Sequence, residues 1–210
     1  AAKPAQLIGR DDAISLADAA QGYVSRAALK LIAGLEHFGL AVDGLGTLDI
    51  GSSTGGFIQV LLERGARHVT GVEVGHGQLH PSLGTDARVT NLEGLNARDL
   101  AEDHINGRGI RFITSDVSFI SLKLALPPAM NLAKAGAHCL LLVKPQFEAG
   151  REAIGKGGLL KYPLEGERVA AELAQWLDAQ AGWRALGLCP SPIEGGDGNR
   201  EYLLAGVKDQ

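Results

Sequence analysis

Cysteine, aromatic residues and long apolar runs are all scarce in this chain of 210 residues. Its two cysteines, Cys139 and Cys189, lie inside apolar runs, where buried reduced thiols are much commoner than disulfides or metal ligands. The longest uncharged apolar stretch, residues 135–143, is about half of the ~20 residues that a membrane-spanning helix needs. No basic-then-apolar signal segment opens the sequence. These absences argue against a disulfide scaffold and a membrane partner, and we expect a cytoplasmic location.

An excess of positive charge is also missing. The 20 Lys and Arg residues against 24 Asp and Glu give a net charge of −4, so the molecule as a whole does not attract nucleic acid or anionic membranes. Any polyanion must therefore bind to a local patch of positive charge. The chain is rich in apolar residues, at 45%, and in glycine, with 29 residues. This composition is typical of one globular domain that buries its own core and makes many tight turns.

Short apolar runs alternate with helical segments along most of the chain. The expected strands are Gly46–Ile50, His68–Val74, Arg88–Leu92, Ile110–Ser115, Ala137–Val143, Arg184–Cys189 and Glu201–Val207. The expected helices are Ser25–Phe38, Phe57–Arg64, Leu122–Ala133 and Leu164–Ala181. Strands that are nearly continuously apolar are typical of a sheet that is covered by helices on both faces.

The order of these elements predicts a Rossmann-like α/β fold. Alternating strands and helices imply parallel strands with right-handed crossovers. The last two strands differ, because residues 189–198 between them contain prolines and glycines but no helical period, which predicts an antiparallel hairpin. We therefore predict a seven-stranded, mostly parallel methyltransferase sheet with a C-terminal hairpin in residues 23–210. Residues 1–22, whose periodicity is weak, are expected to form a leader or linker.

A glycine-rich turn joins the first expected strand to a helix in the segment Leu48–Phe57, which reads LDIGSSTGGF. Glycines let the backbone approach a ligand, and the start of a helix presents free N–H groups there. Twenty-two residues after Gly51, Glu73 ends the second strand, where a carboxylate can accept both hydroxyls of a ribose. This combination predicts a nucleoside cofactor.

The turn also discriminates between nucleoside cofactors. The dinucleotide fingerprint needs a second glycine where this chain has Ser53, and no Gly-Lys-Ser/Thr follows as in a phosphate-binding loop. The pattern Asp-x-Gly-x-Ser-x-Gly suits S-adenosylmethionine, whose methionine tail carries a carboxylate and an ammonium group rather than phosphates. The alternative is a glycine turn that merely connects a strand to a helix.

Four further segments carry charged side chains that a plain scaffold does not need. They are YVSRAALKL (23–31), SDVSFIS (115–121), LVKPQFE (142–148) and GNREY (198–202). Asp116 and Lys144 follow the C-terminal ends of predicted parallel strands, which is the edge where open α/β sheets bind ligands. We therefore expect both side chains to lie near the glycine-rich turn.

Together with that turn, these segments resemble the TlyA (haemolysin A) family of ribosomal RNA 2′-O-methyltransferases, within the FtsJ-like group that uses a Lys-Asp-Lys-Glu tetrad. The resemblance extends from Tyr23 over nearly the whole chain and is most specific at residues 25–31, 49–57, 74–79, 143–148 and 155–158. It implies an FtsJ-like methyltransferase domain at residues 23–210, S-adenosylmethionine as cofactor, and ribosomal RNA or a ribosomal subunit as partner. The implied catalytic tetrad is Lys30, Asp116, Lys144 and Glu201.

The chemistry of the reaction suits these residue types. A ribose 2′-hydroxyl is a poor nucleophile until its proton leaves, whereas the sulfonium carbon needs only in-line approach and no metal. Lys144 is the candidate base, because a lysine beside a second lysine gives up its proton more readily. Asp116 and Glu201 would orient the lysines and hold the ribose, and Lys30 would stabilise the developing alkoxide. Taken singly, each of these residues also has an ordinary reading as a solvated or paired surface charge.

The resemblance also implies which residues hold the cofactor. The methionine side would be lined by Gly51, Ser52, Ser53, Thr54, Gly55, Gly56 and Phe57, with Asp116 close by. Glu73 and Val74 would contact the ribose, and Leu92 and Glu93 the adenine edge. Asn96 and Asp99 are further candidates for the polar contact with adenine.

The sequence departs from the family in one respect that bears on RNA binding. Family members usually carry a small N-terminal RNA-binding module, and only about twenty residues precede Tyr23 here. Arg151, Lys156 and Lys161 are candidates for lining an RNA entrance, although a solvated glycine-rich loop explains them equally well. The alternatives are therefore a methyltransferase fold acting on a non-RNA substrate, and a cofactor-binding ribosome-assembly factor without catalysis.

Two other functional classes fit the sequence poorly. A pore-forming toxin, which the haemolysin name suggests, needs a spanning or basic amphipathic segment that the sequence does not offer. His76 and His80 are four residues apart, but a glycine between them and a proline after them argue against a zinc-binding helix. We expect a polar loop there and no metal. The oligomeric state is not encoded in any motif of the sequence.

Overall fold

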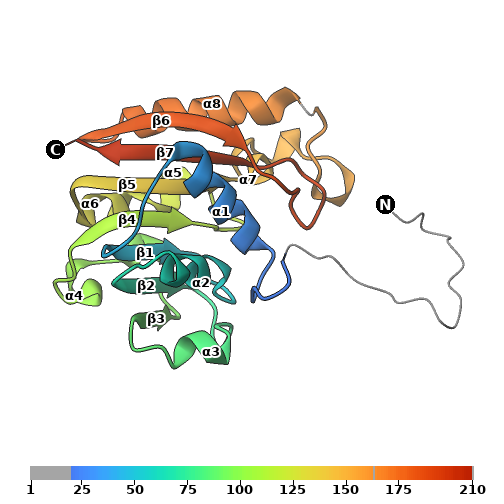
Figure 1. Cartoon of the computed structure of the whole chain (residues 1–210). Helices are drawn as coiled ribbons and strands as arrows, with labels where there is room; N and C mark the ends of the chain where they lie inside the picture. The colour runs from blue at the N-terminus through green and yellow to red at the C-terminus, as the bar shows by residue number, and fades with distance from the viewer. Residues whose placement is uncertain (1–19, 163, 210) are drawn as a thin grey trace, which may run out of the picture.

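In the computed structural model, the described residues, 20–162 and 164–209, build one seven-stranded sheet (Figure 1). The strand order is β3-β2-β1-β4-β5-β7-β6. The strands are β1 (Gly46–Ile50), β2 (His68–Glu73), β3 (Val89–Glu93), β4 (Ile110–Ser115), β5 (Ala133–Val143), β6 (Trp183–Pro190) and β7 (Tyr202–Lys208). β1 to β5 pair in parallel, and β7 lies antiparallel between β5 and β6. The predicted mostly parallel sheet with a C-terminal antiparallel hairpin is confirmed.

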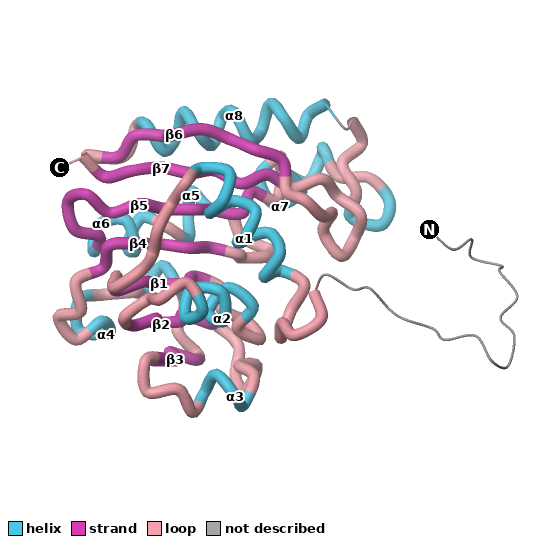
Figure 2. Tube along the Cα trace, in the orientation of Figure 1, coloured by secondary structure: helices cyan, strands magenta, loops and turns pink. Residues whose placement is uncertain are grey.

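Helices cover both faces of this sheet (Figure 2). One face is covered by α1 (Ala27–Phe38), α2 (Gly56–Glu63) and α3 (Pro81–Gly84). The other is covered by α4 (Glu102–Ile105), α5 (Leu122–Ala125), α6 (Pro127–Leu132) and α8 (Leu164–Asp178). The short helix α7 (Pro145–Glu148) and the 3₁₀ turns η1 (Ala97–Asp99), η2 (Arg151–Ala153) and η3 (Lys156–Gly158) belong to the connections. The molecule therefore has two hydrophobic cores, one on each side of the sheet.

β5, an interior strand of the sheet, explains why the strands are nearly continuously apolar. Cys139 and Leu141 point into the core beneath α6 and α8, whereas Leu140 and Leu142 point into the core beneath α1 and α2. Successive side chains of a strand face opposite sides, so a strand between two helical layers has to be apolar at every position. Both cysteines are buried free thiols, as predicted.

Element boundaries differ from the sequence-based expectation in several places, one of them at a pair of prolines. The single helix expected at 122–133 is two short helices, because Pro127 and Pro128 lack the backbone N–H that a continuing helix requires, and Pro127 starts α6 instead. β5 begins at Ala133 rather than Ala137, and α1 begins at Ala27 rather than Ser25. The Ser25 hydroxyl accepts a hydrogen bond from the backbone N–H of Ala27, so Ser25 precedes the helix.

Of the predicted leader at 1–22, residues 1–19 lie outside the described residues, and residues 20–22 form a turn before α1. The domain predicted over 23–210 contains all the elements above. No helix in the described part of the chain is long and apolar enough to span a bilayer.

Candidate active site

The glycine-rich turn after β1 lies against the end of β4. Gly51 has a φ of 82°, and a Cβ atom at this position would lie 3.0 Å from the backbone oxygen of Asp116. The Asp116 N–H also donates to the carbonyl of Ile50 at 3.0 Å. Only glycine allows both this φ and this approach. The local sequence thus brings Asp116 to the glycine-rich turn, as its position after a parallel strand predicted.

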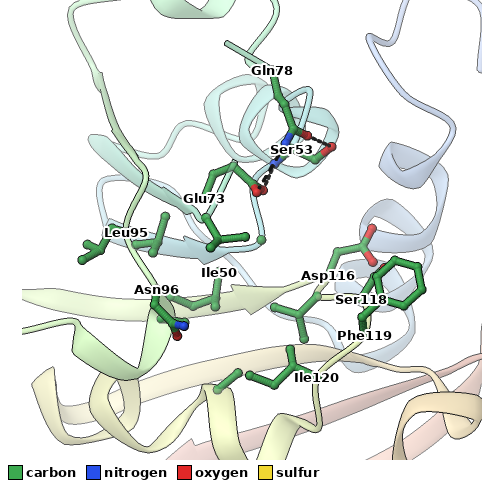
Figure 3. A pocket seen from close by; sticks show the side chains of 16 residues that line it. Ile50, Ser53, Glu73, Gln78, Leu95, Asn96, Asp116, Ser118, Phe119 and Ile120 are labelled. Atoms are coloured by element: carbon green, nitrogen blue, oxygen red, sulfur yellow. Dashed lines mark hydrogen bonds between the residues drawn. The ribbon is translucent and has the colours of Figure 1, made fainter. Parts of the chain in front are cut away.

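Glu73 at the end of β2 holds the turn from the other side (Figure 3). Its Oε2 accepts the Ser53 N–H at 3.0 Å, and its Oε1 accepts the Gly75 N–H at 2.8 Å. Ser53 has a φ of 45°, a conformation that non-glycine residues adopt mainly where the surroundings enforce it. An ionised carboxylate has about four acceptor sites, so Glu73 retains capacity for ligand hydroxyls.

A pocket of about 460 Å³ opens between the ends of β1, β2 and β4. This volume lies in the usual range for small-molecule sites of roughly 300–1,000 Å³. Five of the residues predicted to bind the cofactor line it: Gly51, Ser53, Glu73, Val74 and Asp116. Most of the remaining wall is apolar and includes Ile50, Val72, Val117 and Ile120. The pocket therefore combines apolar walls with a few convergent polar groups.

The predicted adenine contacts lie differently. Leu92 and Glu93 are not among the residues that line the pocket, because Leu92 packs against the core and Glu93 accepts the Gly77 N–H at 2.9 Å. The chain after β3 supplies Leu95, Asn96 and Ala97 instead, together with Gln78 from the preceding connection. Asn96 was an alternative in the sequence, whereas Leu95, Ala97 and Gln78 were missed, because no motif marks them.

All but one of the remaining predicted loop residues face a smaller cavity of about 70 Å³ between the glycine-rich turn and the start of α1. Ser52, Thr54, Gly56 and Phe57 line it, together with Gly51, Ser53 and Asp116. Gly55 lines neither cavity. With a φ of 96°, it lies so close to α3 that a Cβ atom would be 2.4 Å from a methyl carbon of Leu83. Its role in the structure is packing of the turn.

Asp49, which the predicted set did not include, also lines the small cavity. It is fully buried; its Oδ1 accepts the Thr114 hydroxyl at 2.7 Å, and its Oδ2 has no hydrogen-bond partner within the described residues. Burial, together with the negative charges of Asp116 and Glu73, raises the pKa of Asp49 to about 7, although the hydrogen bond from Thr114 acts in the opposite direction. Three carboxylates thus surround this end of the site, which is an environment suited to a cationic group such as an ammonium.

The four residues of the predicted tetrad form two ion pairs. Lys30 Nζ lies 2.5 Å from Glu201 Oε2, and both side chains are buried. Lys144 Nζ lies 2.6 Å from Asp116 Oδ1 and also donates to the Ser118 hydroxyl at 2.9 Å. Burial raises the pKa of Glu201 in spite of Lys30, and the charges of Lys144 and Asp116 also act on it. The two pairs are therefore electrostatic neighbours.

The fold explains why residues so distant in sequence converge. Lys144 follows β5, and Glu201 precedes the antiparallel β7, whose Tyr202 pairs with Val143 of β5. Lys30 is one helical turn before Gly34, where α1 approaches β5 closely enough that a Cβ atom would be 2.7 Å from Leu140. The four tetrad residues therefore meet at the carboxyl ends of the parallel strands, although each belongs to a different element or connection.

An exposed aromatic side chain borders the site. Phe119 is 91% exposed and has a φ of 64°, which is a strained value for a bulky residue. Its ring lies 5.0 Å from that of Phe147, which follows Lys144 in α7, and Phe119 itself lines the larger pocket (Figure 3). Exposed aromatic rings are the surfaces on which unstacked nucleobases stack. No motif in the sequence marks Phe119.

Within residues 20–162 and 164–209, no three His, Cys, Asp or Glu side chains gather in a way that could hold a metal ion. His80, one of the two spaced histidines, contacts the Ser82 hydroxyl through Nδ1 at 2.8 Å. It acts as a cap of the short helix α3.

Comparison with known proteins gives one consistent result. Residues 23–208 match the FtsJ-like methyltransferase family. The chain is 43% identical to the 16S/23S rRNA (cytidine-2′-O)-methyltransferase TlyA of Mycobacterium tuberculosis over 97% of this chain and 76% of that protein, and 38% identical to Hemolysin A of Brachyspira hyodysenteriae over 86% and 75%. A crystal structure of a candidate hemolysin from Lactococcus lactis superposes with a TM-score of 0.84 at 41% identity, covering 89% of each chain.

More distant structures agree on the fold alone. An O-methyltransferase from Bacillus cereus, solved in complex with SAH, superposes with a TM-score of 0.60 at 17% identity, over 88% of this chain and 82% of that chain. The methyltransferase fold predicted from the strand order is thereby confirmed, as is the resemblance to TlyA and haemolysin A. On these grounds the chain belongs to the FtsJ-like methyltransferase family.

Proposed function

We propose that this protein transfers a methyl group from S-adenosylmethionine to the ribose 2′-hydroxyl of a cytidine in ribosomal RNA. The substrate in this proposal is inferred from the relatives named above, because the Mycobacterium tuberculosis protein is named for this reaction. The observation that carries the proposal is the position of Asp116, which pairs with Lys144 and also lines both cavities beside the glycine-rich turn. The candidate base is thus one side chain away from the proposed cofactor site.

The residues around the two cavities fit the cofactor. Glu73 at the pocket wall suits ribose hydroxyls, and Leu95 and Ala97 offer apolar surface to a purine with Asn96 as its polar neighbour. The unpartnered Oδ2 of Asp49 suits the ammonium group of a methionine tail. When bound, S-adenosylmethionine supplies an electrophilic methyl group on a sulfonium ion.

In this proposal the ammonium group of Lys144, which is paired with Asp116 in the resting protein, first releases a proton to water. The neutral amine then accepts the proton of the 2′-hydroxyl. Its Nζ sits between Asp116 and the Ser118 hydroxyl, which together fix the direction of the amine. A positioned base of this kind contributes about 10²–10⁴-fold to the rate. Asp116 then has two tasks: it orients Lys144, and it lies close enough to the pocket to hold the ribose.

Lys30 and Glu201 form the second pair and act on the charge that develops at the ribose oxygen. A buried ammonium close to the reacting oxygen stabilises an alkoxide more strongly than an exposed one, because water does not screen it. Glu201 fixes the ammonium group of Lys30 at 2.5 Å and compensates its charge in the resting enzyme. Both residues are thus assigned to electrostatic stabilisation and positioning.

The test is transfer of tritiated methyl groups from S-adenosylmethionine to unmodified ribosomal subunits, with Lys144→Ala alongside. Methylated riboses resist alkaline hydrolysis, so the expected product is labelled, alkali-resistant dinucleotides that yield 2′-O-methylcytidine on complete digestion. Lys144→Ala should lose about 10²–10⁴-fold in kcat with an unchanged dissociation constant for the cofactor. Lys134→Ala, which removes an exposed lysine from the start of β5, is the matched control and should retain full activity.

Other outcomes would assign another function. Label in alkali-sensitive nucleotides would indicate methylation of a base, and label in protein or small molecules a different substrate class. Cofactor binding without transfer to any ribosomal particle would favour an assembly factor that does not catalyse. A Lys144→Ala variant with most of its activity would show that the base has been assigned to the wrong residue.

A further inference from the structure

A glycine-rich segment follows α7 and projects beside the tetrad. We name residues 150–162 the basic arm; it contains η2 and η3 and is closed by a β-bridge between Ile154 and Leu160. In Figure 1 the connection after α7 and the loop between β6 and β7 lie together at the right edge of the sheet. Nothing in the proposed chemistry uses the basic arm.

The charge of the basic arm is opposite to that of the whole chain. It carries Arg151, Lys156 and Lys161 against one acid, Glu152, whereas the chain has a net charge of −4. All three cations are exposed, and none has a carboxylate oxygen within 4.0 Å in the described structure. Lys161 donates to the backbone oxygen of Glu152, which leaves its charge uncompensated. By contrast, Arg64, Arg88, Arg168 and Arg184 are held in salt bridges elsewhere on the surface.

Apolar surface accompanies these cations. Tyr162 is 70% exposed and directly follows Lys161, and Leu159 is 42% exposed. Phe119 lies exposed on the loop that carries Asp116, and its ring contacts that of Phe147 in α7, the helix that precedes the basic arm. Unpaired cations interleaved with exposed aromatic rings are the pattern by which proteins hold single-stranded nucleic acid, since phosphates meet the cations and bases stack on the rings.

A buried asparagine fixes the basic arm to the loop that carries Glu201. Asn199 is 4% exposed; its Nδ2 donates to the Gly158 carbonyl at 2.9 Å, and its Oδ1 accepts the Leu160 N–H at 3.1 Å. The Asn199 N–H donates in turn to Asp197 Oδ1, whose second oxygen accepts from Gln146 of α7. Because Asn199 precedes Glu201 by two residues, the position of the basic arm is linked to the position of Glu201.

We propose that the basic arm binds the phosphates of the RNA strand that enters the site, and that Asn199 is a positioning residue that couples this contact to Glu201. This inference rests on the proposed function, because it assumes that the substrate is RNA. Phosphate contacts add affinity and register without taking part in the chemistry. The two parts of the proposal thus differ in their kinetic signature: the cations act on KM, and Asn199 acts on KM and kcat.

The first experiment compares Lys156→Glu and Lys161→Glu with Lys134→Glu in the full chain. Lys134 is an exposed lysine at the start of β5, on the opposite edge of the sheet. Binding to a short fluorescein-labelled, cytidine-containing single-stranded RNA is followed by anisotropy over a range of salt concentrations, and methyl transfer to unmodified ribosomal subunits is measured in parallel. Each basic-arm variant should weaken RNA binding and raise KM about five- to tenfold, and should reduce the salt slope by about 0.7, with kcat unchanged. Lys134→Glu should stay within about twofold of the unmodified protein.

The second experiment concerns Asn199. Asn199→Asp keeps the size of the side chain but loses the donor to Gly158, and Asn199→Ala loses both contacts. Both should raise KM for the ribosomal subunit and lower kcat about tenfold, while the dissociation constant for the cofactor, measured by calorimetry, stays unchanged. A thermal melt of each variant separates this effect from unfolding. A loss of cofactor binding in parallel with activity would contradict the positioning role.

The outcomes separate this inference from the proposed function. Methyl transfer to RNA with basic-arm variants that behave like Lys134→Glu would contradict the RNA-binding role of the basic arm and would agree with the proposed function. RNA binding that depends on Lys156 and Lys161, without methyl transfer, would contradict the proposed function and would support the RNA-binding role of the basic arm. A chain that does not bind RNA at all would overturn both.

Discussion

Ser53 and Gly75 hold Glu73 through backbone N–H groups, whereas Lys30 and Lys144 meet their carboxylate partners through long side chains. One half of the site is thus formed by backbone groups and the other by charged side chains. The half at β1 and β2 is a turn whose backbone forms the cavity wall. The other half is a set of charged side chains that lie on or next to four elements, α1, β4, β5 and β7. The shape of the first half is set by the course of the backbone. The electrostatic field of the second half is set by the charged side chains that are buried together.

This difference decides how each half tolerates change. A backbone-built wall is damaged by added volume or by a residue that cannot adopt a positive φ, and the damage is felt in ligand affinity. A set of buried charges is damaged when one partner disappears, because the remaining ion is left uncompensated. Substitutions in the two halves should therefore separate cofactor affinity from turnover and stability.

The largest effect is expected from Lys30→Met, which breaks the more deeply buried ion pair. We expect kcat for methyl transfer to fall about 10³-fold, since the proposed alkoxide stabilisation is lost. Unfolding in urea should show a loss of about 3 kcal/mol, limited by uptake of a proton at Glu201, whose pKa burial already raises.

The double variant Lys30→Met/Glu201→Leu sharpens this prediction. With neither charge left, stability should recover to within about 1 kcal/mol of the unmodified protein while turnover stays low. Cofactor affinity should be unchanged in both variants, because neither residue lines the larger pocket. A double variant as unstable as the single one would show that Lys30 stabilises through packing of its methylene chain and not through charge.

The same division explains how much could be predicted from the sequence. The half that we propose to bind the cofactor was predictable from one contiguous stretch, because a strand, a glycine-rich turn and an acid at the end of the next strand are neighbours in the chain and in space. The tetrad residues were identified through a family resemblance, and their convergence depends on the β5–β7 register and on the approach of α1 at Gly34. No local pattern encodes such long-range packing.

The residues that were missed have the same physical explanation. Asp49 begins the pattern Asp-x-Gly-x-Ser-x-Gly, but it lies inside a strand and has no charged partner in the sequence, so its place in the wall of the small cavity is visible only in the structure. Asn199 and Phe119 belong to loops whose course is set by tertiary contacts. The break at Pro127 and Pro128, by contrast, is visible in the sequence. The single helix expected there was wrong because two consecutive prolines lack the backbone N–H groups that a continuing helix requires.

Asp49 links the two halves and should make stability depend on pH. Its pKa is about 7 in the folded protein and near 3.8 in the unfolded chain, so between these values the folded state holds a proton that the unfolded state releases. The free energy of unfolding should therefore fall as the pH rises from about 4 to about 7, by up to about 4 kcal/mol for this group. Asp49→Asn should flatten that part of the profile in urea titrations.

Cofactor binding should show the complementary dependence. If the ammonium group of the cofactor meets Asp49, its affinity should rise as the pH rises through about 7, where the carboxylate ionises. Calorimetry at a series of pH values measures this, and Thr114→Val is a useful second variant because it removes the hydroxyl that donates to Asp49. An affinity of Asp49→Asn equal to that of the unmodified protein at high pH would exclude the contact.

Gly55→Ala tests the backbone-built half. The added Cβ would lie 2.4 Å from Leu83 and 2.8 Å from Leu79, at a φ of 96°. Strain of about 1–3 kcal/mol should displace the turn and raise the dissociation constant for S-adenosylmethionine about twentyfold, with kcat at saturating cofactor reduced much less. Gly84→Ala in the neighbouring α3 is the control, since its Cβ would approach Leu79 only to 4.0 Å. Equal affinity in the two variants would mean that the turn absorbs the extra atom.

Phe119→Ala should give the smallest effect on methyl transfer. We expect it to change the KM for the ribosomal subunit and not the affinity for the cofactor. Phe119 is 91% exposed, so its removal costs little core packing, and loss of a stacked base predicts about a fivefold higher KM for the ribosomal subunit. Phe119→Trp keeps an aromatic surface and should keep the KM, whereas Phe119→Gly also relieves the positive φ of 64° and should be at least as stable as Phe119→Ala. The dissociation constant for the cofactor should change less than twofold in all three variants. A cofactor affinity that falls in step with KM would show that Phe119 closes the pocket and that its exposed ring is not a surface for a base.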